Sequence, residues 1–166
     1  MVILAVVSIA GYFGVDLRGG PAPAGNATET APAQPRSTPT GSRAASSTAD
    51  RAGSQQAVVE LMRAQQSGEM VTLIATVVKV LEDDNDGSRH QRLLLEIETR
   101  GAPFDTVLIA HNIDLAPRVP ASEGDELTVR GQYEFNDRGA VLHWTHHDPK
   151  DWREGGWIEL NGERYE

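Results

Sequence analysis

The stretch VTLIATVVKVL, residues 71–81, decides the fold predicted for this chain. It is apolar at both odd and even positions and rich in β-branched residues, which is typical of a long strand buried on both faces. Residues 91–99 alternate instead, with Leu93, Leu95 and Ile97 on one face and mostly charged residues on the other. Such alternation indicates a strand with one buried face. The two segments together predict the start of a mainly β domain.

Three further strands are predicted downstream, over residues 104–111, 126–135 and 140–147. The segment HNIDLAPRVP, residues 111–120, predicts a short helical connection that ends at its two prolines. Three strands, a helical connection and two more strands is the order of the five-stranded OB barrel. The predicted fold is therefore a small, mainly β, OB-like barrel, with a generic antiparallel sandwich as the alternative.

Two smaller elements flank these strands. Residues 58–62 place apolar side chains at helical spacing and Gly68 follows them, which predicts one helix before the first strand. The segment GGWIELNGERY, residues 155–165, predicts a small hairpin with its turn at Asn161-Gly162.

The hairpin of the last two barrel strands has a predicted register. Burial favours Phe135 opposite Ala140, which brings Gly131 opposite Trp144, so that the indole covers the bare backbone of the glycine. A three-residue loop with Gly139 in a bulge would exchange the two faces. In the preferred register a polar band faces outward, consisting of Arg130, Gln132, Glu134, His143, Thr145 and His147.

The first third of the chain differs in composition from the rest. Residues 1–17 are almost wholly apolar, and Ala22-Pro23-Ala24 resembles a signal-peptidase site, so residues 1–18 predict a signal peptide or a membrane anchor. Residues 19–54 contain no Val, Ile, Leu, Met or aromatic residue and predict a disordered tether rich in Ala, Pro, Ser and Thr. Residues 55–166 then form the predicted domain. This organisation predicts an exported protein of the periplasm or cell envelope, either secreted or tethered to the membrane.

Composition excludes several classes of chemistry. The chain has 166 residues, which suits one domain, and it contains no cysteine. Disulfides, thiolate nucleophiles and sulfur-ligated metals are therefore excluded. The formal net charge is −9, so phosphate backbones are repelled at long range and non-specific nucleic-acid binding is disfavoured.

All five histidines fall in the last 77 residues, among acids, amides and arginines. A divalent metal is the one cofactor that this composition suggests, with His111, Asp114, His143 and His147 as the candidate ligands. His143 and His147 would lie about 13 Å apart on one strand, which is too far for a single ion to reach both. A site would need His146 or His147 to leave the strand, or one of these histidines to pair with His111 and a carboxylate such as Asp114 or Asp148. The alternative is that these histidines are surface or hydrogen-bonding residues.

Four long motifs are DDNDGSRHQR, LIAHNIDLAPR, GQYEFNDRGAVLHWTHHDP and GWIELNGERY. Together they resemble the bacterial family known as Domain of Unknown Function 3465, and the likeness covers about residues 71–165. The resemblance implies a small exported bacterial protein whose four motifs belong to one folded unit. It implies no reaction and no catalytic residues.

Two function classes follow. The first is an extracytoplasmic binding module for a polar or anionic ligand or for an envelope protein. The second is a metal-assisted hydrolase of the phosphodiesterase or nuclease type, which needs the histidines and acids to converge within about 5 Å. The candidate ligand-binding residues are Arg89, His90, Arg92, His111, Asn112, Asp114, Arg118, Glu134, His143, His147 and Asp148.

Overall fold

The computed structural model describes residues 48–166. The predicted signal peptide or anchor at 1–18, and the tether as far as residue 47, lie outside the described residues. Helix α1 (Thr48–Ala64) begins inside the segment that composition assigns to the tether. The part of the chain that the structure describes includes no helix long and apolar enough to cross a membrane.

The end of α1 is set by backbone geometry rather than by the predicted glycine. Gln65 adopts a left-handed φ of 51° directly after the last helical residue. The Gln65 N–H donates to Met62 O at 3.2 Å and the Gln66 N–H donates to Leu61 O at 3.1 Å. These two bonds satisfy carbonyls that the helix end leaves open, as in a Schellman motif. The helix therefore stops before Gly68.

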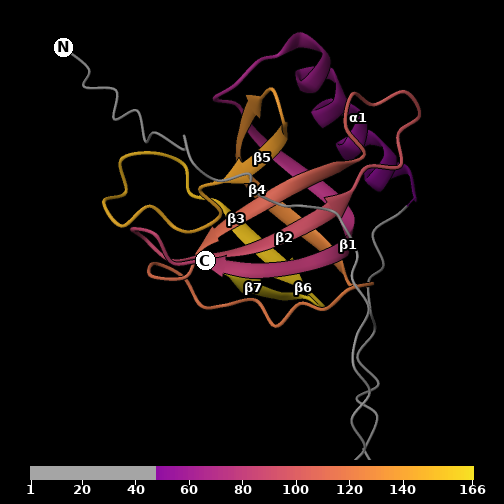
Figure 1. Ribbon diagram of the computed structural model, residues 1–166. Helices are drawn as coiled ribbons and strands as arrows, with labels where there is room; N and C mark the ends of the chain where they lie inside the picture. Colours follow the sequence, from indigo (N-terminus) through magenta and orange to yellow (C-terminus); the bar gives the residue numbers. More distant parts are fainter. Residues whose placement is uncertain (1–47) are drawn as a thin grey trace, which may run out of the picture. The chain divides into compact units, whose positions relative to one another are not determined.

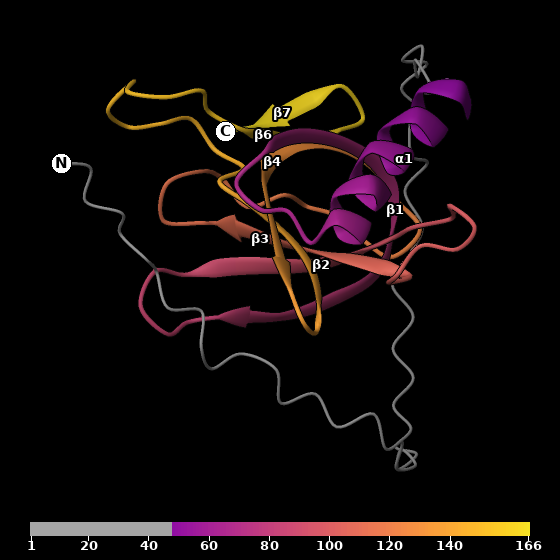
Figure 2. The same cartoon turned by 90° about the horizontal axis from the view of Figure 1, so that it is seen from above.

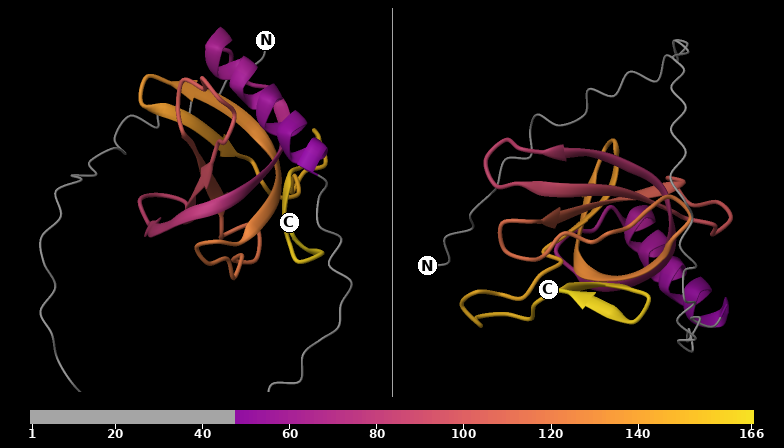
Figure 3. Two further views of the ribbon diagram at one scale, coloured as in Figure 1. Left: turned by 90° about the vertical axis from the view of Figure 1, so that its right-hand side faces the viewer. Right: turned by 90° about the horizontal axis from the view of Figure 1, so that it is seen from below.

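Seven strands follow the helix. They are β1 (Met70–Asp84), β2 (His90–Glu96), β3 (Thr106–Asn112), β4 (Glu126–Asn136), β5 (Gly139–His143), β6 (Trp157–Leu160) and β7 (Glu163–Tyr165). Their order in the sheet is β1-β2-β3-β5-β4-β6-β7, and a further pairing of β1 with β4 closes a ring through five strands. β3 and β5 run parallel, whereas the other pairs are antiparallel. The described chain is thus mainly β with one helix (Figure 1), and the ring strands curve round a common interior (Figure 3).

The long strand β1 pairs with two different strands along its length. Its first half, residues 70–76, pairs with β4, and its second half, from Val77, pairs with β2 with irregular register. The first half carries consecutive buried residues, as predicted, but Val78 and Val80 in the second half are 39% and 38% exposed. The prediction that residues 71–81 are buried on both faces is therefore correct for only part of this segment.

Helix α1 packs against β1 and places Val58, Val59 and Met62 in the main hydrophobic core. Two polar side chains fix the helix to the strands. The Arg51 guanidinium contacts Glu98, Glu126 and Thr76 at 2.8–2.9 Å. In Figures 1 and 2, α1 lies on the right of the domain and the segment that joins β5 to β6 lies on the left.

Gln55, the second of these side chains, is 2% exposed. Its amide donates to Ile74 O at 3.3 Å and accepts from the Glu98 N–H at 2.8 Å. The amide of Gln55 therefore satisfies a donor and an acceptor of the backbone that the strand pairing leaves open.

The predicted register of the β4–β5 hairpin is confirmed for Phe135 opposite Ala140 and for Tyr133 opposite Leu142. The predicted continuation to residue 147 is wrong, because β5 ends at His143 and Trp144 turns the chain with a φ of 56°.

The residue that covers Gly131 is also different from the predicted one. A Cβ at Gly131 would lie 2.8 Å from Thr145 Cγ2 and 2.6 Å from His143 O. Thr145, and not Trp144, therefore fills the space over this glycine. This close approach leaves no room for any larger residue at position 131.

The segment 144–156 is a loop inserted between two strands that pair with the same edge of β4. β5 pairs along the second half of β4 and β6 pairs along Thr128 to Arg130. The chain returns at Gly156, where a Cβ would collide with the carbonyl oxygens of Trp144 and Arg130. The predicted terminal hairpin is confirmed, and its turn has positive φ at Asn161 (54°) and Gly162 (84°), as a tight turn requires.

The predicted helical connection between β3 and β4 is reduced to a single turn, and no helix forms there. It contains one hydrogen-bonded turn, in which the Ala116 N–H donates to Asn112 O at 3.1 Å, and then continues without helix. The buried amide of Gln91 donates to Val119 O at 2.8 Å and accepts from the Val119 N–H at 2.9 Å. A side chain that takes both backbone groups of Val119 replaces the partners that a helix would supply.

Candidate binding face

The pairing of four strands brings polar side chains from distant parts of the sequence onto one outward surface. Arg92 of β2 is paired with Ala110 of β3, and His143 of β5 is paired with Gln132 of β4. The last β3–β5 pair lies one residue before Ala110 and His143, so these two are neighbours. Paired residues point to the same face of a sheet. We call this surface the polar face; its members are all half-buried and are His90, Arg92, Asn112, Gln132, Glu134 and His143.

Three buried side-chain polar atoms in residues 48–166 have no hydrogen-bond partner: Tyr133 Oη, His143 Nε2 and Trp144 Nε1. All three belong to the β4–β5 hairpin or to the residue that follows it. Tyr133 points into the core, and burial raises the pKa of its hydroxyl to about 12. Buried polar groups without partners are uncommon because each costs free energy. Their concentration here marks the hairpin as the part of the described chain where polar groups are least satisfied.

His143 lies at the centre of the polar face, and its side chain is 31% exposed. Its Nε2 is 3.6 Å from Glu134 Oε1, which is too long for a hydrogen bond. Burial lowers the pKa of the His143 imidazole, the nearby Glu134 carboxylate partly opposes this, and the charges of Arg153 and His90 add to the lowering. A lowered pKa favours the neutral ring at pH 7, and Nε2 has no hydrogen-bond partner within the described residues.

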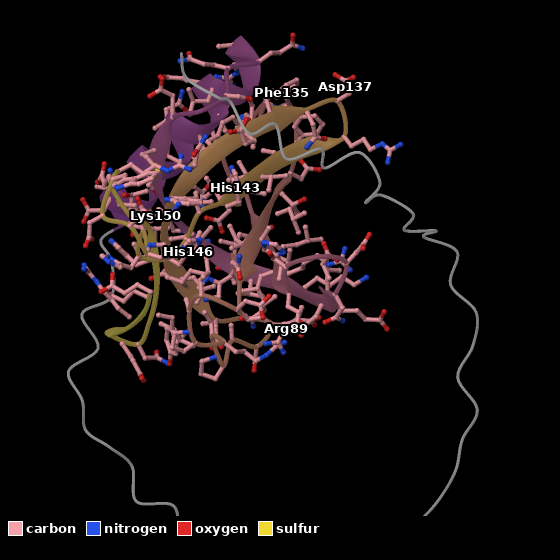
Figure 4. All side chains as sticks on the ribbon, turned by 90° about the vertical axis from the view of Figure 1, so that its left-hand side faces the viewer. Arg89, Phe135, Asp137, His143, His146 and Lys150 are labelled. Carbon is pink, nitrogen blue, oxygen red and sulfur yellow. The ribbon has the colours of Figure 1, made fainter. Side chains whose placement is uncertain are left out.

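The neighbours of His143 form a short chain of polar contacts. The Gln132 amide donates to Glu134 Oε1 at 2.9 Å, and Arg153 Nη1 donates to Gln132 Oε1 at 3.4 Å. Arg153 comes from the loop 144–156, so this loop borders the polar face. Figure 4 shows His143 on the hairpin and His146 and Lys150 toward the loop.

Trp144 links the loop to the sheet. Its ring lies under the Arg153 guanidinium, with 3.9 Å between the guanidinium carbon and the ring centroid. The His146 ring contacts it as well, at 4.7 Å between centroids. A cation over an indole face is attracted by the ring quadrupole. The contact therefore holds Arg153 close to Gln132.

The rest of the loop is built around Asp148. Its carboxylate accepts the backbone N–H groups of Lys150, Trp152 and Arg153 at 2.9–3.1 Å, and these bonds, that of Lys150 first, lower the pKa of Asp148. The Gly156 N–H donates to His146 O at 2.9 Å and closes the base of the loop. Asp148, one of the candidate ligand-binding residues, thus organises the loop.

His111 is fully buried and lies away from the polar face. Its Nε2 is 3.0 Å from Pro117 O and its Nδ1 is 2.8 Å from Thr145 Oγ1. A carbonyl only accepts, so Nε2 carries the proton, and the neutral ring accepts the Thr145 hydroxyl at Nδ1. Burial lowers the pKa of His111 and keeps it neutral. Both nitrogens are occupied, which leaves His111 with a structural role.

Two of the arginines predicted to bind a ligand form ion pairs with acidic residues of the same chain. Arg89 binds Asp114 through its backbone N–H at 2.8 Å and its Nε at 2.7 Å. These bonds, that of the backbone N–H first, lower the pKa of Asp114. Arg118 forms an ion pair with Asp83. These predicted residues therefore lie beside the polar face and order its surrounding loops.

The four candidate metal ligands are not brought together. His111 is buried, Asp114 binds Arg89, His143 faces Glu134, and His147 Nε2 lies 3.0 Å from Asp151 on the loop. Across residues 48–166, no three His, Asp or Glu side chains are arranged to hold a metal ion. The convergence that the hydrolase hypothesis needs is not seen in this part of the chain.

Of the predicted outward band, three members remain on the polar face: Gln132, Glu134 and His143. Arg130 lies on the same side of β4 as Gln132 but already binds Glu154 and Thr72, whereas Thr145 is buried under His111 and His147 lies on the loop. Sequence reasoning missed Trp144 and Arg153 as a contact pair. The one signal for it is Gly155-Gly156, which marks where the chain returns to the sheet.

These features define a small, mainly β protein domain with one polar, incompletely satisfied outward face. Residues 42–166 match the family described as Protein of unknown function (DUF3465), so the chain belongs to this family. The resemblance carried by the four sequence motifs is thereby confirmed. No curated protein and no solved structure matches the chain.

Proposed function

We propose that this protein is a binding module that holds a polar ligand on the polar face. The observation that carries this proposal is the set of unpartnered polar atoms on and beside the β4–β5 hairpin, above all His143 Nε2. A neutral imidazole next to a carboxylate and two amide side chains offers both donors and acceptors to a ligand. Ligand groups that complete these bonds recover the free energy that the free protein lacks.

The fold is of the OB type in this proposal. Support comes from the ring order β1-β2-β3-β5-β4 and from the parallel β3–β5 pair, which a five-stranded Greek-key barrel requires. Binding surfaces of OB folds include the outward side of the second and third strands. His90, Arg92 and Asn112 lie on those strands. The covering helix precedes β1 here instead of joining β3 to β4.

The protein acts outside the cytoplasm in this proposal, as a secreted or membrane-tethered component of the cell envelope. Support comes from the apolar residues 1–17 and the Ala22-Pro23-Ala24 site. Fusion of alkaline phosphatase after residue 47 tests this, because the enzyme becomes active only if it is exported. An inactive fusion, beside an active one that carries a known signal peptide, would refute the location.

The binding proposal is tested by nuclear magnetic resonance on the full chain labelled with ¹⁵N. Neutral sugars, carboxylic acids, nucleotides and short peptides are added in turn, and we expect one class to shift amide signals of Arg92, Asn112 and His143. His143→Ala should lower the affinity for that ligand at least about tenfold, and Arg164→Ala, on the remote strand β7, should leave the affinity unchanged. Shifts confined to other surfaces, or none from any class, would refute the proposal.

A further inference from the structure

The tip of the loop 144–156 exposes one large aromatic side chain. Trp152 is 80% exposed, and the Lys150 ammonium lies 4.4 Å from its ring centroid. A tryptophan has about 150–250 Å² of surface to bury, so this exposure forgoes a large contact. The backbone N–H of Trp152 donates to the Asp148 carboxylate at 2.9 Å, and the bond from the Gly156 N–H to His146 O closes the base of the loop. The ring is therefore presented from an ordered backbone.

A hollow of about 450 Å³ lies at the other side of the sheet, between the end of α1 and the turn of the β4–β5 hairpin. Its apolar surface comes from Met62, Pro103, Phe104 and Phe135, and the two phenylalanine rings are 6.2 Å apart. Asp137 supplies an exposed carboxylate at its edge. Arg63 and Gln65 complete the lining, and the Arg63 guanidinium already donates to Gly101 O at 3.1 Å.

The Trp152 side chain cannot reach the hollow of its own molecule. The hollow adjoins the turn of the β4–β5 hairpin, whereas the loop leaves at the hairpin's other end, after His143. Figure 4 places Phe135 and Asp137 at the hairpin turn and Lys150 well away from it. Figures 1 and 2 agree that α1 and the loop lie on opposite sides of the domain. Any pairing of loop and hollow therefore joins two molecules.

We propose that Trp152 of one copy docks into the Phe104–Phe135 hollow of a second copy, with Lys150 beside Asp137. The chemistry matches at both points: an indole meets aromatic rings, and an ammonium meets a carboxylate. The contact uses different surfaces on the two copies, so it is heterologous, and copies join head to tail. This interface uses none of the polar-face residues, so it stands independently of the proposed ligand binding.

The experiment is analytical ultracentrifugation of the full chain over a wide range of protein concentration. We expect the weight-average mass to rise with concentration above the 18.0 kDa of one chain. Trp152→Ala should raise the dissociation constant about tenfold or more, since a buried aromatic anchor typically contributes at least this much. Equal concentration dependence in Trp152→Ala and the wild type, or a constant mass of one chain in the wild type, would overturn the proposal.

A charge exchange tests the partner assignment. Lys150→Glu and Asp137→Lys should each weaken association, and an equimolar mixture of the two variants should associate better than either alone. In that mixture the carboxylate introduced on the loop of one variant meets the ammonium introduced at the hollow of the other. Lys79→Glu makes the same charge change as Lys150→Glu on the exposed part of β1 and should leave association as in the wild type. A mixture no better than the separate variants would show that Lys150 and Asp137 do not meet.

Discussion

Polar side chains have hydrogen-bond partners on the helix side of this domain, where α1 packs on the strands, but lack some of them on the polar face. Under α1, Gln55 is 2% exposed and bonds to the backbone of Ile74 in β1 and of Glu98 just after β2, and Arg51, 16% exposed, has three partners. On the polar face and beside it, His143 Nε2 and Trp144 Nε1 are buried and have none within the described residues. Both regions contain half-buried or buried polar groups, but only one of them completes its hydrogen bonds internally.

Under the proposed function, this difference assigns the helix side to stability and the polar face to ligand binding. A satisfied buried network fixes the position of α1 on the sheet, so it contributes to the native state without help from a ligand. Unsatisfied buried groups cost stability, and a bound ligand that completes their hydrogen bonds recovers part of that cost. The helix side is therefore expected to respond to mutation through folding, and the polar face through binding.

Among single substitutions, the largest effect is expected on the helix side. Gln55→Ala leaves Ile74 O and the Glu98 N–H without partners, and each buried group of this kind costs about 1–3 kcal/mol. The free energy of unfolding should fall by at least about 2 kcal/mol in chemical denaturation. Gln56→Ala, one position along, removes only an exposed contact to Glu60 and should stay within about 0.5 kcal/mol. Equal losses for the two variants would contradict the comparison.

The β framework was predictable from the sequence because its signals are local. Alternation placed β2 and β4, the Asn161-Gly162 turn placed the last hairpin, and the burial pattern gave the register through Phe135. Two failures have tertiary causes. Trp144 takes a left-handed conformation where the chain passes close to Gly156, and both backbone polar groups of Val119 bind the amide of Gln91 from β2.

The candidate face was predictable in part. His90, Arg92, Asn112, Glu134 and His143 were all candidates, and strand pairing brings them onto one surface. Their companions on the loop were not predictable, because the contact of Arg153 with Trp144 depends on a loop that leaves and rejoins the edge of β4. Sequence spacing gives no measure of such a return.

Acid should weaken the fold through two histidines that are neutral when folded. The folded pKa values of His111 and His143 are lowered, mainly by burial, so below about pH 6.5 the unfolded chain binds protons that the folded chain does not. The free energy of unfolding should therefore fall as pH drops from 6.5 to 5, by up to about 1.4 kcal/mol per pH unit for each histidine.

Denaturation at a series of pH values measures this slope. His143→Gln should reduce it, whereas His147→Gln, whose ring is 64% exposed, should keep the slope of the wild type. An unchanged slope in His143→Gln would mean that this ring does not resist protonation in the folded state.

A smaller effect is expected where the loop meets the polar face. Arg153→Ala removes the cation from the Trp144 ring, which at an exposed site is worth about 0.5–1 kcal/mol. The loop 144–156 should become more sensitive to limited proteolysis. Arg164→Ala removes a similar contact over Trp157, 4.0 Å from its ring, and should lower stability without exposing the loop. Equal proteolysis of the two variants would show that Arg153 does not hold the loop.

The smallest effect on stability is expected at the centre of the polar face. His143→Ala should change the free energy of unfolding at pH 7.5 by no more than about 0.5 kcal/mol, because Nε2 makes no hydrogen bond that could be lost. His111→Ala is the matched control, because the His111 ring is also neutral but both of its nitrogens are hydrogen-bonded. This substitution should lower the free energy of unfolding by more than about 1 kcal/mol. A similar loss in the two variants would make His143 a structural residue like His111. A small loss combined with weaker ligand binding would instead assign its neutral ring to recognition.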